Sequence, residues 1–348
     1  ANTSGHSQGT VSGIAGHNYP LAWGNQWDVT GTDINTEKYY TLENDETVLT
    51  NTFNYDNYDG NIQIINEHYC THVLTSNNEL WAWGYNGYGT YGNNTTQSFN
   101  YPQLVQSSYF NNKKIVKLCR VSYYNRCVLT NNGEVYAWGG GSYGAFLKGN
   151  TSAYHSPQLI SWFTNNNIKI VDVTGGAYTW IALSNEGKVY TWGQNNYGMR
   201  GNGNTSSYNN ETSPFELSDD DNQNNGLFGK VVTHIKAREY HCMALTNENE
   251  LYTWGEGGEY ALGQSNTNTQ HRPIKVDFNW GGTIVQIDAC YRGCMVLINN
   301  GTVYNWGSGG DYSLGNSSAS SNWQPQIPTG LLDINIIKIA CGYEKNKY

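Results

Sequence analysis

The stretch Val189-Tyr190-Thr191-Trp192-Gly193 decides the fold, because close copies of it recur along the chain. The copies with a Trp-Gly pair at the same place are Leu80–Gly84, Val135–Gly139, Leu251–Gly255, Val303–Gly307 and, more weakly, Pro20–Gly24. Their tryptophans stand 52 to 62 residues apart, at Trp23, Trp83, Trp138, Trp192, Trp254 and Trp306. That spacing is too long for a solenoid repeat of one helix pair and fits one four-stranded blade of a β-propeller.

Each copy divides into short strands. Strand A is an apolar run such as Ile168/Ile170, strand B is a second run such as Ile181–Leu183, and strand C carries the Trp-Gly pair. Such runs are typical of strands that neighbouring blades cover on both faces. A Gly or Asn, which accepts the left-handed φ of a hairpin turn, stands five residues before each tryptophan; these residues are Asn18, Asn78, Gly133, Gly187, Asn249 and Gly301.

Proline marks the fourth strand. Five of the seven prolines stand 19 or 22 residues past a repeat tryptophan, at Pro102, Pro157, Pro214, Pro273 and Pro325. Proline lacks the backbone N–H that a central strand needs, so it is tolerated on an edge strand. We therefore expect these prolines to open an edge strand D in each blade.

The pattern of an apolar strand, a turn ending in Gly, Val-Tyr-x-Trp-Gly-x-Asn-x-Tyr-Gly and a later Pro resembles the regulator of chromosome condensation repeat. The resemblance covers essentially the whole chain, and the C-terminal Ile339–Glu344 resembles the family's strand A. It implies an all-β propeller, usually of seven blades in that family. It also implies functions that range from guanine-nucleotide exchange to enzyme inhibition and partner binding, so it defines the fold more closely than the function.

The two ends of the chain predict how the ring closes. Thr10–Gly24 aligns without a gap on His241–Gly255, so we expect the chain to begin at strand B of a blade and to end just after strand A of one, Ile334–Cys341. We predict one all-β propeller of six four-stranded blades over residues 10–348, closed by pairing of the N- and C-terminal strands, with a flexible arm over residues 1–9. Closure would remove an open sheet edge. Seven blades in an incomplete chain is the alternative.

Composition argues against several function classes. The net charge is −9 and no run concentrates the 19 lysines and arginines, which disfavours nucleic-acid binding. No apolar run reaches the roughly 18 residues of a membrane-spanning helix, so we expect no membrane insertion. The chain has no nucleophile elbow, P-loop or dinucleotide fingerprint, and we expect neither an enzyme nor a bound cofactor.

Two candidate metal motifs are set aside. His68 and His72 would share one face of a helix, but here they fall on an expected turn and strand. The acidic segment Asp219–Asn224 offers oxygen ligands but lacks the Gly and the distal Glu of an EF-hand loop. We therefore expect no metal site.

The recurring aromatic residues have two roles. The six repeat tryptophans occupy one place in the pleat and are expected to form the core. Tyrosines recur five or six residues beyond them and are expected to brace the loop between strands C and D, with contact to a partner or glycan as the alternative; they are Tyr88, Tyr143, Tyr197, Tyr260 and Tyr312.

The cysteines form no CxxC pair and no zinc-site spacing, and their number is odd. They are Cys70, Cys119, Cys127, Cys242, Cys290, Cys294 and Cys341. Most of them fall on strands A and B, so buried free thiols are the preferred prediction. Pairing of the near neighbours Cys119/Cys127 and Cys290/Cys294 in an oxidising compartment is the alternative.

Four glycosylation sequons fall in equivalent loops after the Trp-Gly pair, at Asn94, Asn150, Asn204 and Asn316. Few lysines with many Asn, Thr, Ser, Gly and Tyr favour an extracellular, cell-surface or virion protein, with a cytoplasmic or nuclear one as the alternative.

The sequence leaves three function classes. The first is a non-catalytic scaffold whose rim of Gly, Tyr and Asn loops binds another protein or a glycan. The second is a guanine-nucleotide exchange factor for a small GTPase, as in the best-known relatives. The third is a structural subunit that assembles with copies of itself or with other chains.

Overall fold

The structure is a computed structural model that describes residues 62–341, except residues 68, 196, 205, 207–211, 219–224 and 333. These residues form five separate four-stranded antiparallel sheets. Short helical turns join some of the strands. The predicted all-β architecture of four-stranded blades is confirmed.

The strands follow the repeats of the sequence. Blade 1 contains β1 (Gln63–Glu67), β2 (Cys70–Leu74), β3 (Leu80–Gly84) and β4 (Phe99–Val105). Blade 2 contains β5 (Ile115–Cys119), β6 (Asn125–Thr130), β7 (Val135–Gly139) and β8 (Tyr154–Leu159). Blade 3 contains β9 (Ile170–Gly175), β10 (Thr179–Ser184), β11 (Val189–Gly193) and β12 (Phe215–Glu216). Blade 4 contains β13 (Val232–Arg238), β14 (His241–Thr246), β15 (Leu251–Gly255) and β16 (Gln270–Lys275), and blade 5 contains β17 (Ile284–Ala289), β18 (Gly293–Ile298), β19 (Val303–Gly307) and β20 (Asn322–Gln326).

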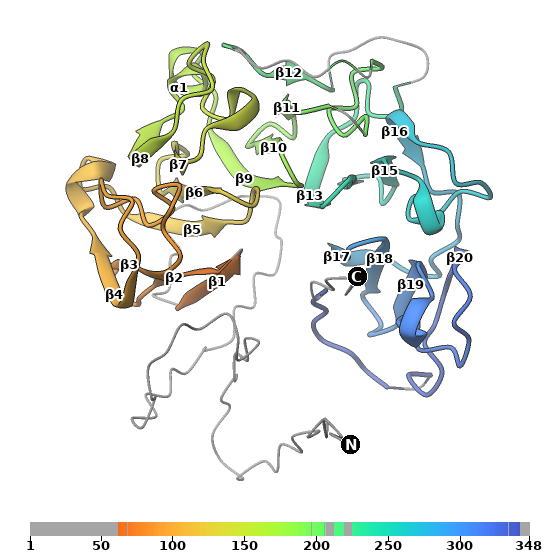
Figure 1. The fold of residues 1–348 in the computed structure, drawn as a ribbon. Helices are drawn as coiled ribbons and strands as arrows, with labels where there is room; N and C mark the ends of the chain where they lie inside the picture. Colours follow the sequence, from red (N-terminus) through yellow and green to blue (C-terminus); the bar gives the residue numbers. More distant parts are fainter. Residues whose placement is uncertain are drawn as a thin grey trace, which may run out of the picture.

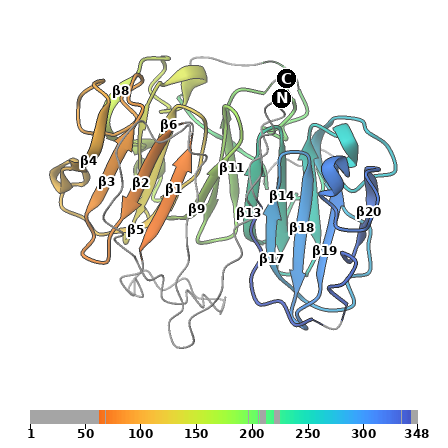
Figure 2. The ribbon, with the colours of Figure 1, turned by 60° about the horizontal axis from the view of Figure 1, so that its bottom comes forward.

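The blades are arranged around a common centre (Figure 1). Strands β1, β5, β9, β13 and β17 lie nearest this centre, and the fourth strand of each sheet lies at the outside (Figures 1 and 2). The helical turns η1 (Ser107–Phe110), η2 (Ser142–Gly144), η3 (Gly258–Tyr260) and η4 (Gly310–Tyr312) and the short helix α1 (Ser161–Asn165) lie in the connections. The sequence order of strands is therefore also their order from the centre outwards.

The hairpin turn between the second and third strands links consecutive blades. Asn78 and Asn249 adopt φ of 63° and 64°, as expected for a turn residue. The side chain of Asn78 donates to the carbonyl of Ile115 (2.6 Å) and accepts from its N–H (3.0 Å), so it hydrogen-bonds to the inner strand of the next blade. Where the turn residue is Gly133, its carbonyl accepts from the N–H of Ile170 (3.1 Å). One turn position thus sets both the hairpin and the alignment of the neighbouring blade.

The repeat tryptophans pack between blades. Trp138, Trp192, Trp254 and Trp306 are fully buried, whereas Trp83 is partly exposed. The indole Nε1 of each buried tryptophan donates to a loop carbonyl of the preceding blade; the acceptors are Thr90 (2.8 Å), Ala145 (3.0 Å), Met199 (2.6 Å) and Ala261 (3.1 Å). Trp23 lies outside the described residues.

The prolines lie on the outer strands, but the prediction that they open those strands is wrong for four of them. Pro102, Pro157, Pro273 and Pro325 lie inside β4, β8, β16 and β20, and only Pro214 precedes its strand. The register of β4 on β3 shifts between Ala82 and Gly84, and β8, β16 and β20 show the same irregularity. Each of the four prolines lies in the gap between the paired residues, where its missing N–H costs no ladder bond.

Residues 334–341 do not form the strand that the sequence predicts, but they occupy the place of a sixth inner strand. The N–H of Ile336 donates to the carbonyl of Gly301 (3.0 Å), as Ile170 does to Gly133. The N-terminal partner expected to complete this blade, Thr10–Gly24, and the expected arm over residues 1–9 lie outside the described residues. Six blades and ring closure therefore stay predictions.

Trp192→Ala is expected to lower the free energy of unfolding by roughly 3–5 kcal/mol, because it leaves a cavity and an unpaired buried carbonyl at Ala145. Chemical denaturation measures the change. Trp81→Ala is the control, since Trp81 is partly exposed and its indole donates to the Glu79 side chain (3.3 Å). Equal losses in the two variants would contradict the inter-blade role.

Candidate functional site

One face of the propeller carries two loops from every described blade. The first loop joins strands one and two, and the second joins strands three and four. At the start of the second loop, a backbone N–H donates to the carbonyl of the last residue of the first loop, as from Tyr85 to Tyr69 (2.7 Å) and from Gln194 to Tyr178 (3.0 Å). Gly84 permits this approach, with φ of 101° and a position at which a Cβ atom would stand 2.2 Å from the Tyr69 carbonyl oxygen. The two loops therefore lie together on one face.

Tyrosines from these loops pair across three blade boundaries. Each pair joins the second loop of one blade to the first loop of the next, with ring centroids 4.1 to 5.0 Å apart; the pairs are Tyr88–Tyr124, Tyr143–Tyr178 and Tyr197–Tyr240. Distances in this range are favourable for aromatic side chains. We call these six residues, together with Tyr69 and Tyr85, the tyrosine face.

The tyrosine face stays partly open to solvent. Tyr88 is 41% exposed and Tyr197 is 38% exposed, although each stacks on a neighbour. Tyr85 extends the group at the boundary of blades 1 and 2, with its ring centroid 6.2 Å from that of Tyr88. Burial and the neighbouring tyrosines raise the pKa of Tyr124, so its phenol is a neutral donor and acceptor near pH 7.

The structure brings together three of the five tyrosines expected to line a rim. Tyr260 and Tyr312 stand six residues after their repeat tryptophans, one position later than the three paired tyrosines. They lie at the ends of η3 and η4. Neither makes a ring contact among the described residues. Tyr312 is 63% exposed. In blade 4 the equivalent of Tyr197 is Glu259, whose carboxylate accepts a hydrogen bond from the Ser321 hydroxyl.

Sequence reasoning missed the partner tyrosines Tyr124, Tyr178 and Tyr240. Each stands directly before the second strand of its blade, as does Tyr69. This recurrence could have identified them, because a residue at the same place in four repeats must meet the same neighbouring loop.

An ion pair replaces the tyrosine pair at the boundary of blades 4 and 5. Arg292 stands at the place of the partner tyrosines, and its guanidinium lies 3.6 Å from the Glu256 carboxylate. It also lies 5.5 Å from the centre of the Tyr291 ring, which is 6.5 Å from the Tyr240 ring. The position of the fourth tyrosine pair is therefore taken by a charged contact.

A hydrogen bond joins the first loops of blades 2 and 4. The Tyr123 hydroxyl donates to the Glu239 carboxylate, and the Glu239 carbonyl accepts from the N–H of Ala177 in blade 3 (2.8 Å). Glu239 is only 4% exposed, and this burial raises the pKa of its carboxyl. The cavity beside it, which Arg120 and Gly175 help to line, measures about 10 Å³. It has room for about one water molecule, whereas small-molecule sites usually exceed about 300 Å³.

The metal candidates gain no support from geometry. Within the residues that the structure describes, no group of three or more His, Cys, Asp or Glu side chains is placed to hold a metal ion. His72 is buried on β2, and burial together with the charge of Arg126 lowers its pKa to about 3. His68 and Asp219–Asn224 lie outside the described residues. No helix among those described is long and apolar enough to cross a membrane.

The four sequon asparagines all lie in the second loop of a blade. Asn94 and Asn204 are exposed, and Asn150 and Asn316 are half-buried. The side-chain oxygen of Asn150 accepts from the N–H of Ser152, and Asn316 makes the same contact with Ser318 (both 3.0 Å). These contacts brace the loops, and glycosylation stays a prediction.

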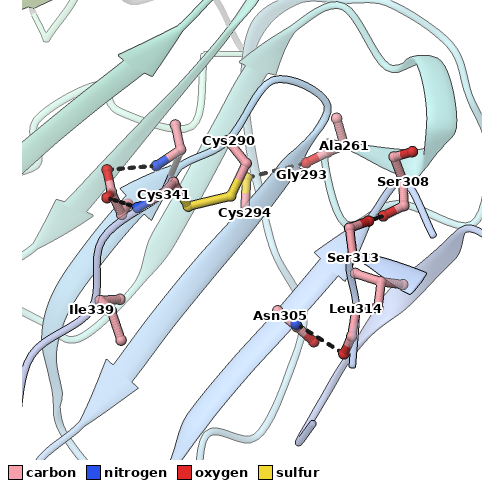
Figure 3. Close-up of a disulfide and its surroundings, with 12 residues drawn as sticks. Ala261, Cys290, Gly293, Cys294, Asn305, Ser308, Ser313, Leu314, Ile339 and Cys341 are labelled. Carbon is pink, nitrogen blue, oxygen red and sulfur yellow. Dashed lines mark hydrogen bonds between the residues drawn. A yellow bond between two sulfur atoms is a disulfide. The ribbon is translucent and has the colours of Figure 1, made fainter. Parts of the chain in front are cut away.

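The cysteine predictions are wrong for two residues. Cys290 and Cys341 form a disulfide, although they are 51 residues apart. The alternative Cys290–Cys294 pair is also wrong, because the Cys294 thiol donates to the carbonyl of Ala261 (3.3 Å; Figure 3). Cys119 and Cys127 face each other across β5 and β6 without a bond, and the five free thiols are all buried, as expected.

Comparison with known proteins identifies the family. The RCC1-like domain matches residues 20–346. The chain belongs to the RCC1-like domain family. Human E3 ubiquitin-protein ligase HERC2 is 26% identical over 270 residues, which are 78% of this chain and 5% of HERC2. Ultraviolet-B receptor UVR8 of Arabidopsis thaliana is 26% identical over 255 residues, 73% of this chain and 54% of UVR8.

Two solved structures share the fold of this RCC1-like domain. Human WBSCR16 superposes with a TM-score of 0.65 at 19% identity, over 81% of this chain and 71% of that one. Yeast RCC1 (Prp20), in a complex with Kap60, superposes with a TM-score of 0.61 at 20% identity, over 78% of this chain and 61% of that one. The chain therefore spans about half of UVR8 and a small part of HERC2.

The stability of this RCC1-like domain is expected to fall as the pH falls from about 6.5 to about 4. Burial lowers the pKa of His241 and of His234 to about 4, so the unfolded chain binds protons in this range before the folded one does. His241→Gln removes one histidine with a lowered pKa, so the free energy of unfolding should fall less between pH 8 and pH 4. Denaturation at several pH values in this range measures the change. An unchanged fall would contradict the role of His241.

Proposed function

We propose that this RCC1-like domain is a non-catalytic binding scaffold, and that its tyrosine face binds a protein partner. The observation that carries the proposal is the set of three tyrosine pairs, each held by its neighbour yet partly exposed. A ring fixed in this way loses little conformational freedom on binding, so more of its contact energy remains as affinity. The absence of basic runs in the sequence disfavours nucleic acid as the partner.

The shape of the described face also favours a partner over a substrate. The cavity beside Glu239 holds about one water molecule, and the Glu239 carboxylate is occupied by Tyr123. Tyrosine and arginine are the residues most enriched among those that dominate protein interfaces, and Arg292 extends the aromatic series. The relative yeast RCC1 was solved with Kap60 bound, which supports protein binding within this family.

Replacing Tyr143 and Tyr197 by Ser is expected to weaken capture of the partner at least about tenfold, because each ring supplies fixed contact area. The measurement is retention of proteins from cell-surface or virion material on the immobilised chain, with a glycan array run beside it. The matched control is Tyr101→Ser with Tyr109→Ser, which removes two tyrosines on and after the outer strand β4.

Equal capture by the two double variants would contradict the tyrosine face as the binding surface. Binding to the array alone would replace the protein partner by a glycan. Failure of both, together with self-association in light scattering, would favour a structural subunit.

The rival function is guanine-nucleotide exchange on a small GTPase, which family membership favours. A panel of GTPases loaded with fluorescent nucleotide distinguishes the two proposals. A non-catalytic scaffold leaves the release rate unchanged at catalytic protein concentrations, because it supplies no group that displaces the nucleotide. Accelerated nucleotide release from any GTPase of the panel at these concentrations would overturn the scaffold proposal.

We also infer an extracellular, cell-surface or virion setting rather than a cytoplasmic or nuclear one. The supporting observation is the Cys290–Cys341 disulfide, because disulfides persist mainly in oxidising compartments. Fractionation of the producing cells tests this inference.

A further inference from the structure

Residues 334–341 lie along blade 5 and are joined to it by one covalent bond. The Gln286 side chain donates to the carbonyl of Ile339 (2.7 Å) and accepts from its N–H (2.9 Å). The N–H of Cys341 donates to the Asp288 carboxylate (2.7 Å), directly beside the disulfide to Cys290 (Figure 3). Gln286 and Asp288 lie on β17, so the segment is fastened to the inner strand of blade 5.

Among the described residues, four hydrogen bonds to blade 5 and limited side-chain packing hold this segment besides the disulfide. It pairs with no strand among the described residues, and only Ile339 of its side chains is buried, against Leu297 and Val303. Ile337 is 86% exposed and Lys338 is also exposed. Segments with few buried contacts open at low free-energy cost. We therefore expect loss of the disulfide to make the segment open more often.

The two bonded cysteines are also the ones that solvent reaches. Cys290 and Cys341 are partly exposed, whereas the five free cysteines are buried. Burial raises the pKa of the thiols of Cys127, Cys242 and Cys294, which keeps them protonated and poorly nucleophilic. Thiol–disulfide exchange with a small molecule is therefore directed to Cys290 and Cys341.

We propose that the Cys290–Cys341 bond is a reversible redox clasp that exchanges with a low-molecular-weight thiol, such as glutathione. In reduction, a glutathione thiolate attacks one sulfur and forms a mixed disulfide, and the other cysteine leaves as a thiolate that takes up a proton. A second glutathione then attacks the mixed disulfide, which yields the second cysteine thiol and one glutathione disulfide. Two electrons and two protons pass to the protein, and glutathione disulfide reverses the step.

Opening the clasp uncovers an apolar surface. In blades 1 to 4 the residues equivalent to Leu297 and Val303 are buried; they are Leu74, Leu80, Leu129, Val135, Leu183, Val189, Leu245 and Leu251. In blade 5, Ile339 and Ile336 provide that cover. Release of the segment therefore leaves one inter-blade surface open to water, a change that a protease or an apolar dye detects.

Limited trypsin digestion of the full chain tests the redox clasp, with cleavage after Lys338 as the measured quantity. The protein is first equilibrated with glutathione disulfide or with dithiothreitol, and the fragments are reduced before their masses are measured, since the disulfide otherwise holds the pieces together. Cleavage at Lys338 is expected to be at least about tenfold faster in the reduced protein. Cleavage at Lys148, an exposed lysine in blade 2, serves as the internal control and should not change. Equal rates at Lys338 in the two states would overturn the proposal.

Two variants separate the bond from general effects of the reductant. Cys341→Ser is expected to be cleaved at Lys338 at the fast rate in both redox states. Cys119→Ser, which changes a buried thiol on β5, should keep the redox response of the unmodified chain. Native maleimide labelling should mark Cys290 and Cys341 only after reduction. Labelling of these two residues after treatment with glutathione disulfide, or slow cleavage of Cys341→Ser, would contradict the clasp.

Discussion

The hydrogen bond from the indole of each buried repeat tryptophan to the preceding blade is the contact on which the rest of the structure depends. Its acceptor always belongs to the residue seven positions after the preceding blade's tryptophan; these residues are Thr90, Ala145, Met199 and Ala261. A large aromatic side chain thus buries its area and satisfies a loop carbonyl that would otherwise be costly to bury. Because donor and acceptor occupy fixed repeat positions, each blade sets the place of the next.

The tyrosine face follows from this contact. Tyr88, Tyr143 and Tyr197 stand two residues before the carbonyls that accept from the indoles, so the bond that seats each blade also fixes its loop tyrosine. Each ring then meets the tyrosine that precedes the second strand of the next blade. The two roles expected for these residues are therefore compatible, since a ring that braces a loop on one side can still present its exposed side to a partner.

The repeat made the strands and their turns predictable, because Trp-Gly and the Gly or Asn before it impose local conformations. Contacts between repeats were harder to foresee. Cys290 and Cys341 are one repeat apart, so they lie at equivalent places in consecutive repeats and form the disulfide, whereas Cys294, four residues from Cys290, directs its thiol to the carbonyl of Ala261. Tyr124 was missed for the same reason. Position within the repeat, rather than distance in sequence, determines which side chains meet.

The boundary between blades 4 and 5 differs from the other three, so the tyrosine face is asymmetric. The ion pair between Glu256 and Arg292 is partly exposed, so water and salt weaken it to at most about 1 kcal/mol. The tyrosine pairs at the other three boundaries depend on dispersion and buried area, which salt does not screen. In the proposed function, contact energy with a partner would therefore be concentrated over blades 1 to 4, and the charged boundary would contribute orientation, because Arg292 offers directed donors beyond the last tyrosine pair.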